Sequence, residues 1–444
     1  MTVLSTLAEN RSNHRYLDLT AVTAICVRVL QEYPTTLACL KPALNVLDTI
    51  SSKEAVLRLS DHCSVLHNVL HINLGSGVLC EQVVHICKSV AQESLVFRVQ
   101  CIKSGMLQDL LEALTHHSNH IQLLFSACDV FISLSKEPLL ENSALRLTII
   151  DYTLHFASAS VFASDPTIIA FSLQALESVC CMSLGCMQFF VKKQGFMHLA
   201  TLLEEFNTCS EVYTACCDLI GAVCAGYSAS RDVLAAGIIP RIVSLLTINT
   251  EVSLQKLTPC FTALRTISYL SVDCVKGLIS AKLVPILLHV ITSETEEIPV
   301  LESMRLLYQI SMVDEGCEQL LQESITEKVG QMLTTPKPED DLAIKRDLLL
   351  QNLSAYSKKR SRSTIRNSHN TPASPLDLSS VLESPLMGIM DVLILLDRHS
   401  ENEVLINLKR LDTLCAAGRY KNECLNDRIE CGPFGSIWSR VKYV

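Results

Sequence analysis

Apolar and polar positions along the chain follow a pattern that recurs about every 43 residues, which is typical of a helical repeat protein. Each repeat contains an apolar helix, a short polar break and a longer helix that ends in an apolar-polar-apolar motif. The spacing within a repeat is helical. Within residues 262–270, the apolar side chains that fall on one helical face are Ala263, Leu264, Ile267 and Leu270. One repeat cannot bury such faces alone, whereas stacked repeats share a continuous core.

The polar or small residue just before the last apolar residue of each long helix marks the repeat. These column residues are Thr49, Ser89, Ser133, Ser178, Gly221, Thr266, Gln309 and Asn352. The steps between them are 40, 44, 45, 43, 45, 43 and 43 residues, and the next match, Thr413, lies 61 residues further on. We expect the column residues on successive helices along one side of an elongated α-solenoid. There they either suit close helix packing or form a groove for a partner segment.

Two segments resemble the armadillo-repeat family. GIIPRIVSLL (237–246) matches the first half of its pattern, and LLLQNLSAYS (348–357) matches the second half. The resemblance implies an all-α fold, a right-handed solenoid of about eight to nine repeats, with HEAT-type or generic helical arrays as rivals. In armadillo proteins, third helices line a groove whose asparagines and tryptophans bind an extended peptide. Here the column has one asparagine, Asn352, and the array has no tryptophan, so the groove of nuclear-import receptors does not carry over.

The repeat pattern divides the chain into five parts. We expect an N-terminal cap segment, the repeat solenoid, a basic Ser/Pro-rich insertion, a further helical repeat or cap, and an irregular tail. Their ranges are 1–19, 20–357, 358–375, 376–431 and 432–444. The tail is either a native or an alternative-splice ending.

The insertion at 358–375 carries five basic residues and no acid. With Ser363 as a possible kinase target, the candidate localisation or regulatory residues are Lys358, Lys359, Arg360, Arg362, Ser363 and Arg366. This composition predicts a disordered loop. It is read either as a solvated linker or as a nuclear-localisation or regulatory peptide.

Composition narrows the functional classes. The chain has 444 residues, of which 49% are apolar and 5% aromatic, and a scarcity of glycine (15) and proline (14) argues against an all-β fold. A net charge of −9 does not favour direct nucleic-acid binding. The longest apolar stretch, 386–396, is too short for the roughly 20 residues of a membrane span. We therefore expect no membrane-spanning segment.

Cysteines are numerous (20) and lie mostly singly within apolar helical patterns. No secretory signal precedes them, so we expect reduced thiols and an intracellular location, cytoplasmic and/or nuclear. Four of them should pack in the core: Cys128, Cys180, Cys217 and Cys260.

Catalytic and metal-binding signatures are missing from the sequence. The histidines of HHSNH (116–120) occupy a polar break, and Cys180, Cys181 and Cys186 are interpreted as core residues. No phosphate loop, nucleophile elbow or zinc-protease motif occurs. We expect no enzyme activity, no cofactor and no metal.

The sequence thus favours a non-enzymatic armadillo-type adaptor or scaffold that binds protein partners along an extended helical surface. Three alternatives stay open. One is a regulatory or assembly subunit of a nuclear or cytoskeletal complex. The others are a nuclear-transport carrier and an enzyme with an unrecognised site. Partner identity and oligomeric state are not written in the sequence.

Overall fold

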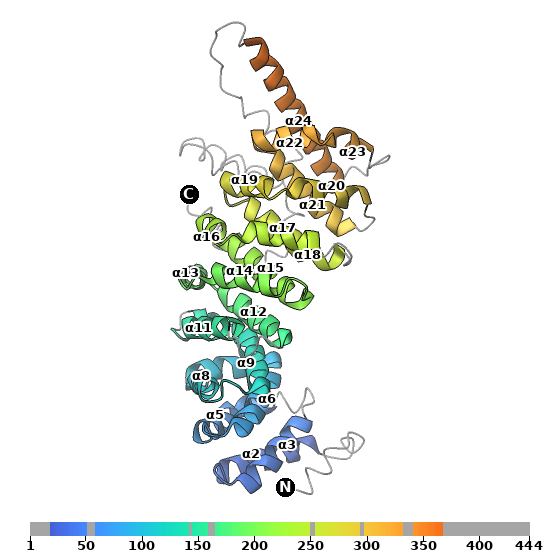
Figure 1. Cartoon of the computed structure of the whole chain (residues 1–444). Coiled ribbons are helices and arrows are strands. Elements are labelled where there is room, and N and C mark those ends of the chain that lie inside the picture. The colour runs from blue at the N-terminus through green and yellow to red at the C-terminus, as the bar shows by residue number, and fades with distance from the viewer. Residues whose placement is uncertain are drawn as a thin grey trace, which may run out of the picture. The chain divides into compact units, whose positions relative to one another are not determined.

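The computed structural model describes residues 18–50, 58–141, 144–158, 165–248, 254–293, 297–331 and 341–366. All regular secondary structure in these ranges is helical, as the sequence predicts (Figure 1). The chain folds as an all-α solenoid. The expected cap segment 1–19, apart from its last two residues, lies outside the described residues. So do the expected repeat at 376–431 and the tail at 432–444.

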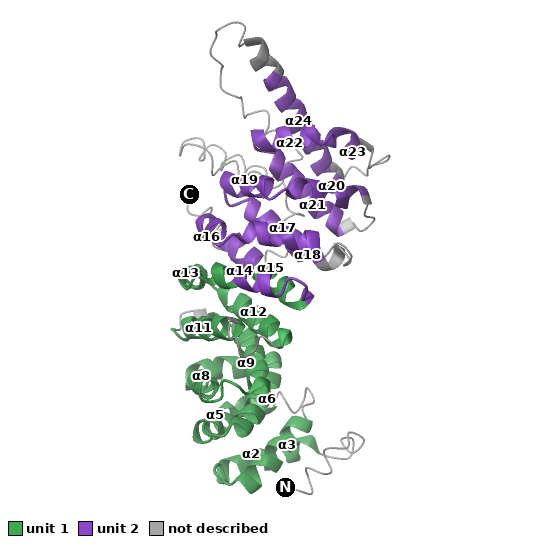
Figure 2. Ribbon diagram, in the orientation of Figure 1, with its two compact units in different colours: residues 1–198, 211–219 green, residues 199–210, 220–444 purple. Residues whose placement is uncertain are grey.

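The helices divide between two compact units (Figure 2). Unit 1 comprises residues 1–198 and 211–219, and unit 2 comprises residues 199–210 and 220–444. Two helices contribute to both units: α14 (Gly195–Glu205) and α15 (Ser210–Gly226).

Within each unit the helices recur in sets of three, each ending in a long third helix. Unit 1 begins with two sets in which two α-helices are described: α2 (Leu19–Glu32) and α3 (Leu37–Thr49), then α5 (Cys63–Ile72) and α6 (Gly77–Glu93), preceded by the 3₁₀ turn η2 (Ser60–His62). Next come α7 (Leu95–Ser104), α8 (Met106–His116) and α9 (Ile121–Leu134), followed by α10 (Pro138–Glu141), α11 (Leu145–Ser158) and α12 (Pro166–Cys180). The last helix wholly in unit 1 is α13 (Leu184–Lys192).

Unit 2 continues the same order. Its sets are α16 (Ser230–Ala235), α17 (Ile238–Ile248) and α18 (Leu254–Ser268), then α19 (Val272–Ser280), α20 (Leu283–Ser293) and α21 (Glu297–Ser311). The last set is α22 (Asp314–Gln322), α23 (Ile325–Gln331) and α24 (Asp341–Arg366). The third helices α18, α21 and α24 pack in sequence, each against the next.

A left-handed backbone turn precedes the second helix of five sets. The residues with positive φ are Gly105, Gln194, Gly237, Lys282 and Ser324. Because only glycine adopts this conformation without steric cost, the three non-glycine residues are held there by the packing of the helices on either side. The repeat therefore conserves the turn even where the sequence offers no glycine.

The core consists mainly of aliphatic side chains and cysteines. The four cysteines expected in the core, Cys128, Cys180, Cys217 and Cys260, are each 1% exposed or less, so that prediction is confirmed. All cysteines in the described ranges are free thiols. A buried thiol acts as a small apolar group, which explains why so many fit between helices.

The basic segment differs from the prediction in its first half. Residues 358–366 are not a disordered loop, because α24 continues through them to Arg366. No proline or glycine interrupts residues 341–366, and Lys359 and Arg360 form exposed ion pairs with α22 that no local pattern reveals. The remainder of the expected insertion, 367–375, lies outside the described residues.

Candidate binding strip on the third helices

Each column residue lies on the third helix of its set. In unit 1 they are Thr49 on α3, Ser89 on α6, Ser133 on α9 and Ser178 on α12. In unit 2 they are Gly221 on α15, Thr266 on α18, Gln309 on α21 and Asn352 on α24. Ser133 and Gln309 are buried, and the other six are half-buried. The repeat pattern therefore assigned each of the eight residues to a third helix correctly, and their alignment along one side stays a prediction.

The column hydroxyl groups all donate within their own helices. Each bonds the carbonyl four residues earlier: Thr49 to Asn45 (2.6 Å), Ser89 to His85 (3.4 Å), Ser133 to Asp129 (2.9 Å), Ser178 to Gln174 (3.0 Å) and Thr266 to Thr262 (2.9 Å). Such bonds satisfy the donor without a neighbouring helix. The oxygen keeps lone pairs that can accept from a bound group.

Residues near the unit 1 column join one third helix to the next. Asp48 on α3 contacts His85 on α6 (Oδ1 to Nε2, 3.2 Å), and Lys88 on α6 contacts Asp129 on α9 (Nζ to Oδ2, 2.6 Å). These residues lie one or four positions before a column residue, and positions three apart, such as these two offsets, are neighbours on one helical face. We call this face, with its column residues, the unit 1 strip.

The unit 1 strip also holds a pair of carboxylates without a cation. Glu177 precedes Ser178 on α12, and Asp218 lies on the adjoining α15 within unit 1. Partial burial, and then the charge of Asp218, raise the pKa of Glu177 to about 7. Among the described residues, no lysine, arginine or histidine forms an ion pair with either carboxylate. At neutral pH, ionisation of Glu177 beside Asp218 is therefore unfavourable.

The corresponding face of unit 2, which we call the unit 2 strip, is built around one carboxylate and several cations. Glu302 on α21 accepts from Arg265 on α18 (2.6 Å) and from Arg305 on its own helix (2.9 Å). Glu302 is buried, at 7% exposed. Lys345 on α24 lies over the ring of Tyr308, with its Nζ 5.1 Å from the ring centroid.

The side chain of the single column asparagine already forms a hydrogen bond within unit 2. Asn352 Nδ2 donates to Ser311 Oγ at the end of α21 (3.0 Å), and that hydroxyl in turn donates to the Tyr308 carbonyl (2.6 Å). In this arrangement the amide nitrogen serves the packing of α24 against α21. A partner could still bond the Asn352 carbonyl oxygen or displace the contact.

The candidate regulatory residues lie at the end of α24. Lys359 pairs with Asp314 of α22 (2.8 Å), and Arg360 pairs with Glu318 (3.3 Å), while Lys358 is exposed. The backbone of Arg362, Ser363 and Arg366 is helical, but their side chains are outside the described part of the structure. α24 thus places two consecutive basic residues, Lys359 and Arg360, against acidic residues of α22.

The histidine cluster at 116–120 contributes to packing between repeats. His117 Nε2 donates to the Leu74 carbonyl (2.8 Å), and His120 Nε2 lies 3.6 Å from Glu81. Within the described ranges, no group of three or more His, Cys, Asp or Glu side chains is arranged to hold a metal ion.

A membrane-crossing helix is likewise not found in the described ranges. No single helix there has the length and apolar composition to cross a membrane, although the bent pair α19–α20, with a 76° break, passes on those two criteria together.

Sequence patterns alone did not single out the charged residues of the strips. Asp48, Lys88, Glu177 and Arg265 each stand directly before a column residue, so the signal is a fixed offset from the column. This signal can be recognised only after the repeats are aligned. It also requires knowing that side chains at this offset point toward the next third helix.

Comparison with known proteins supports the fold. No family model and no curated protein sequence matches the chain. An engineered protein of known crystal structure is similar with a TM-score of 0.66 and 17% identity, covering 79% of this chain and 83% of that one. A second engineered protein (TM-score 0.46, 18% identity) covers 56% and 98%, and a designed armadillo repeat protein (0.41, 14%) covers 64% and 98%. At 17% identity the first of these likenesses concerns the fold alone, a helical repeat solenoid.

Proposed function

We propose that this chain is a non-enzymatic armadillo-type adaptor that binds an extended segment of a protein partner along its third helices. The observation that supports the proposal is the column. The third helix of each set has one small or polar residue at an equivalent position. An extended peptide presents side chains at regular intervals, so it can be bound by a surface that repeats at regular intervals. The armadillo resemblance of residues 237–246 and 348–357 supports the same reading.

The charge of the unit 1 strip favours a partner with basic side chains. A lysine or arginine placed between Glu177 and Asp218 would relieve their repulsion and lower the pKa of Glu177. The same position would repel an acidic partner. The strip therefore supplies selectivity through charge, with the hydroxyl oxygens of the column as additional acceptors.

The proposal is tested with a library of extended peptides that vary in Lys and Arg content, displayed against the full chain at two salt concentrations. Selected peptides should carry basic residues and should bind more weakly to Glu177→Gln/Asp218→Asn. The matched control is Asp61→Asn/Glu112→Gln, which removes the same charge from exposed positions on η2 and α8. Equal binding by both double variants, or selection of peptides without basic residues, would contradict the proposal.

We also propose where this adaptor acts: in the cytoplasm, the nucleus or both. There it would be a subunit of a larger complex. Lys358, Lys359, Arg360, Arg362 and Arg366 are the candidate nuclear-targeting residues. Replacing all five with alanine in a fluorescent fusion should reduce nuclear accumulation. Asp314→Ala/Glu318→Ala, which removes the ion pairs of Lys359 and Arg360 with α22, should increase it. An unchanged distribution in both variants would show that these residues have no role in nuclear targeting.

A further inference from the structure

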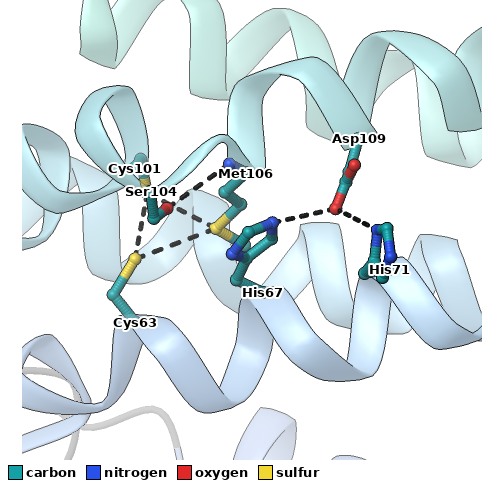
Figure 3. Close-up of polar contacts among 7 residues, drawn as sticks. All are labelled: Cys63, His67, His71, Cys101, Ser104, Met106 and Asp109. Atoms are coloured by element: carbon teal, nitrogen blue, oxygen red, sulfur yellow. Dashed lines mark hydrogen bonds and ion pairs between the residues drawn. The ribbon is translucent and has the colours of Figure 1, made fainter.

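Three sulfur atoms from three helices meet in unit 1 (Figure 3). Cys63 Sγ lies 3.7 Å from Cys101 Sγ and 3.9 Å from Met106 Sδ, and Cys101 Sγ lies 3.6 Å from Met106 Sδ. The three distances form a nearly equilateral triangle. All three residues are buried, at 1%, 3% and 4% exposed.

Helix ends of two successive sets hold the triangle. Cys63 is the first residue of α5, Cys101 lies in the last turn of α7, and Met106 opens α8. Between α7 and α8 the chain reverses through Gly105, whose φ of 89° brings Met106 back toward Cys101. The adjacent Ser104 is exposed, so only a turn of chain separates the sulfurs from solvent.

A point equally distant from the three sulfurs would lie about 2.2 Å from each, which is close to the roughly 2.3 Å of metal–thiolate bonds. Thiolate and thioether ligands are soft, and this ligand type selects Cu(I), zinc and iron–sulfur clusters. A structural zinc site takes four nitrogen or sulfur ligands in a tetrahedron, usually from cysteine and histidine. Two thiols and one thioether in a triangle match the softer ion better.

We propose that Cys63, Cys101 and Met106 form a three-coordinate binding site for Cu(I). Both cysteines bind as thiolates and the methionine through its neutral sulfur, so that binding of one Cu⁺ releases two protons and leaves the site with one negative charge. No electron transfer takes place. The ligand is therefore a monovalent soft metal ion.

One contact positions the ligands in advance. Asp109 of α8 bonds both His67 (Oδ2 to Nε2, 2.8 Å) and His71 (Oδ2 to Nδ1, 3.0 Å) of α5. These bonds fix α5 against α8, the helices that carry Cys63 and Met106, so the ligands are positioned before the ion arrives.

The test uses the full chain, reduced and under anaerobic conditions, titrated with Cu(I) against a chromophoric Cu(I) chelator. Met106→Leu removes one ligand at nearly constant volume, and Met187→Leu on α13 is the matched control because that methionine is also buried (1% exposed). We expect one strongly bound Cu(I) per wild-type chain. Since even an outer-shell change typically costs 10- to 100-fold in metal affinity, loss of a ligand should weaken binding by at least about tenfold. Met187→Leu should bind as the wild type does.

X-ray absorption at the copper edge provides a readout that folding defects do not imitate. In selenomethionine-labelled protein, a Cu–Se scattering path should appear, and it should vanish in labelled Met106→Leu protein but persist in Met187→Leu. Cys63→Ser should abolish the strong site, whereas Cys26→Ser, at a buried position on α2, should retain it. Absence of the Cu–Se path, or equal affinity in the two methionine variants, would overturn the proposal.

Discussion

The two strips share a register but differ in charge. In the unit 1 strip, four carboxylates (Asp48, Asp129, Glu177 and Asp218) accompany one lysine (Lys88) and one histidine (His85). In the unit 2 strip, one carboxylate (Glu302) accompanies three cations (Arg265, Arg305 and Lys345). The positions of these side chains are determined by the packing of the helices, because the opposite faces of the same helices form the core. Their residue types are not determined by that packing, so the two strips can differ in charge.

The difference is clearest for two carboxylates. Glu302 is enclosed by two arginines, so its charge is compensated within the protein. Glu177 faces Asp218 instead, and partial burial, followed by the charge of Asp218, raises its pKa. One strip therefore contains a completed ion-pair network, and the other contains a site that a ligand's positive charge could complete.

Removing the compensated carboxylate should produce the largest effect. Glu302→Ala leaves Arg265 and Arg305 without their shared partner, and breaking a largely buried pair typically costs about 3 kcal/mol. We expect a clear decrease in the thermal midpoint of unfolding. Glu315→Ala, which removes an exposed partner of Lys276, should change it little. Equal shifts in the two variants would show that the Glu302 network is not the stabilising feature of unit 2.

The uncompensated carboxylate should give a pH-dependent effect of intermediate size. The pKa of Glu177 rises from its ordinary 4.5 to about 7 on folding, so the folded state binds the extra proton between these values. The resulting stability is present below pH 4.5 and is lost as pH rises through 7. Because a glutamine cannot ionise, Glu177→Gln should stabilise the protein at pH 8 by about 2 kcal/mol, with allowance for solvent screening, and hardly at all at pH 4.

Thermal unfolding across pH 4–8 measures this directly. Glu112→Gln, on the exposed face of α8, is the control for loss of a charge. If Glu177→Gln stabilises the protein equally at all pH values, ionisation of Glu177 is not the destabilising factor. Glu177 would then not differ from Glu302 in charge compensation.

The smallest effect is expected at the column itself. Ser178→Ala deletes a hydroxyl that donates only to the Gln174 carbonyl of its own helix, so stability should change by no more than about 0.5 kcal/mol. If the column contacts a partner, the same variant should weaken peptide binding while leaving the thermal midpoint unchanged. A large loss of stability would instead mark the column as a packing feature.

Local patterns predicted much of the fold. The helical period and the column from Thr49 to Asn352 were readable because each repeat presents its apolar residues in one register. The left-handed turns were only partly readable, since Gly105 and Gly237 mark them but Gln194, Lys282 and Ser324 carry no glycine signal. The basic residues after position 357 were predicted as a loop, but α24 continues to Arg366, and Lys359 and Arg360 pair with Asp314 and Glu318 of another helix.

The candidate sites were less accessible to sequence reasoning. Cys63 and Cys101 are 38 residues apart and resemble ordinary core cysteines, and only the packing of α5, α7 and α8 brings them to Met106. The charged strip residues form pairs across one repeat, and no motif within a repeat records which partner each will meet.

Polar contacts between distant residues almost all span one repeat. Lys88–Asp129, Arg265–Glu302 and Asn352–Ser311 are separated by 41, 37 and 41 positions. In the described part of the chain, segments that must find each other therefore lie about one repeat apart along the backbone. Because folding rates follow the sequence separation of native contacts, each unit should fold at the rate set by a neighbouring pair of repeats. Adding or removing a whole repeat should leave that rate nearly unchanged.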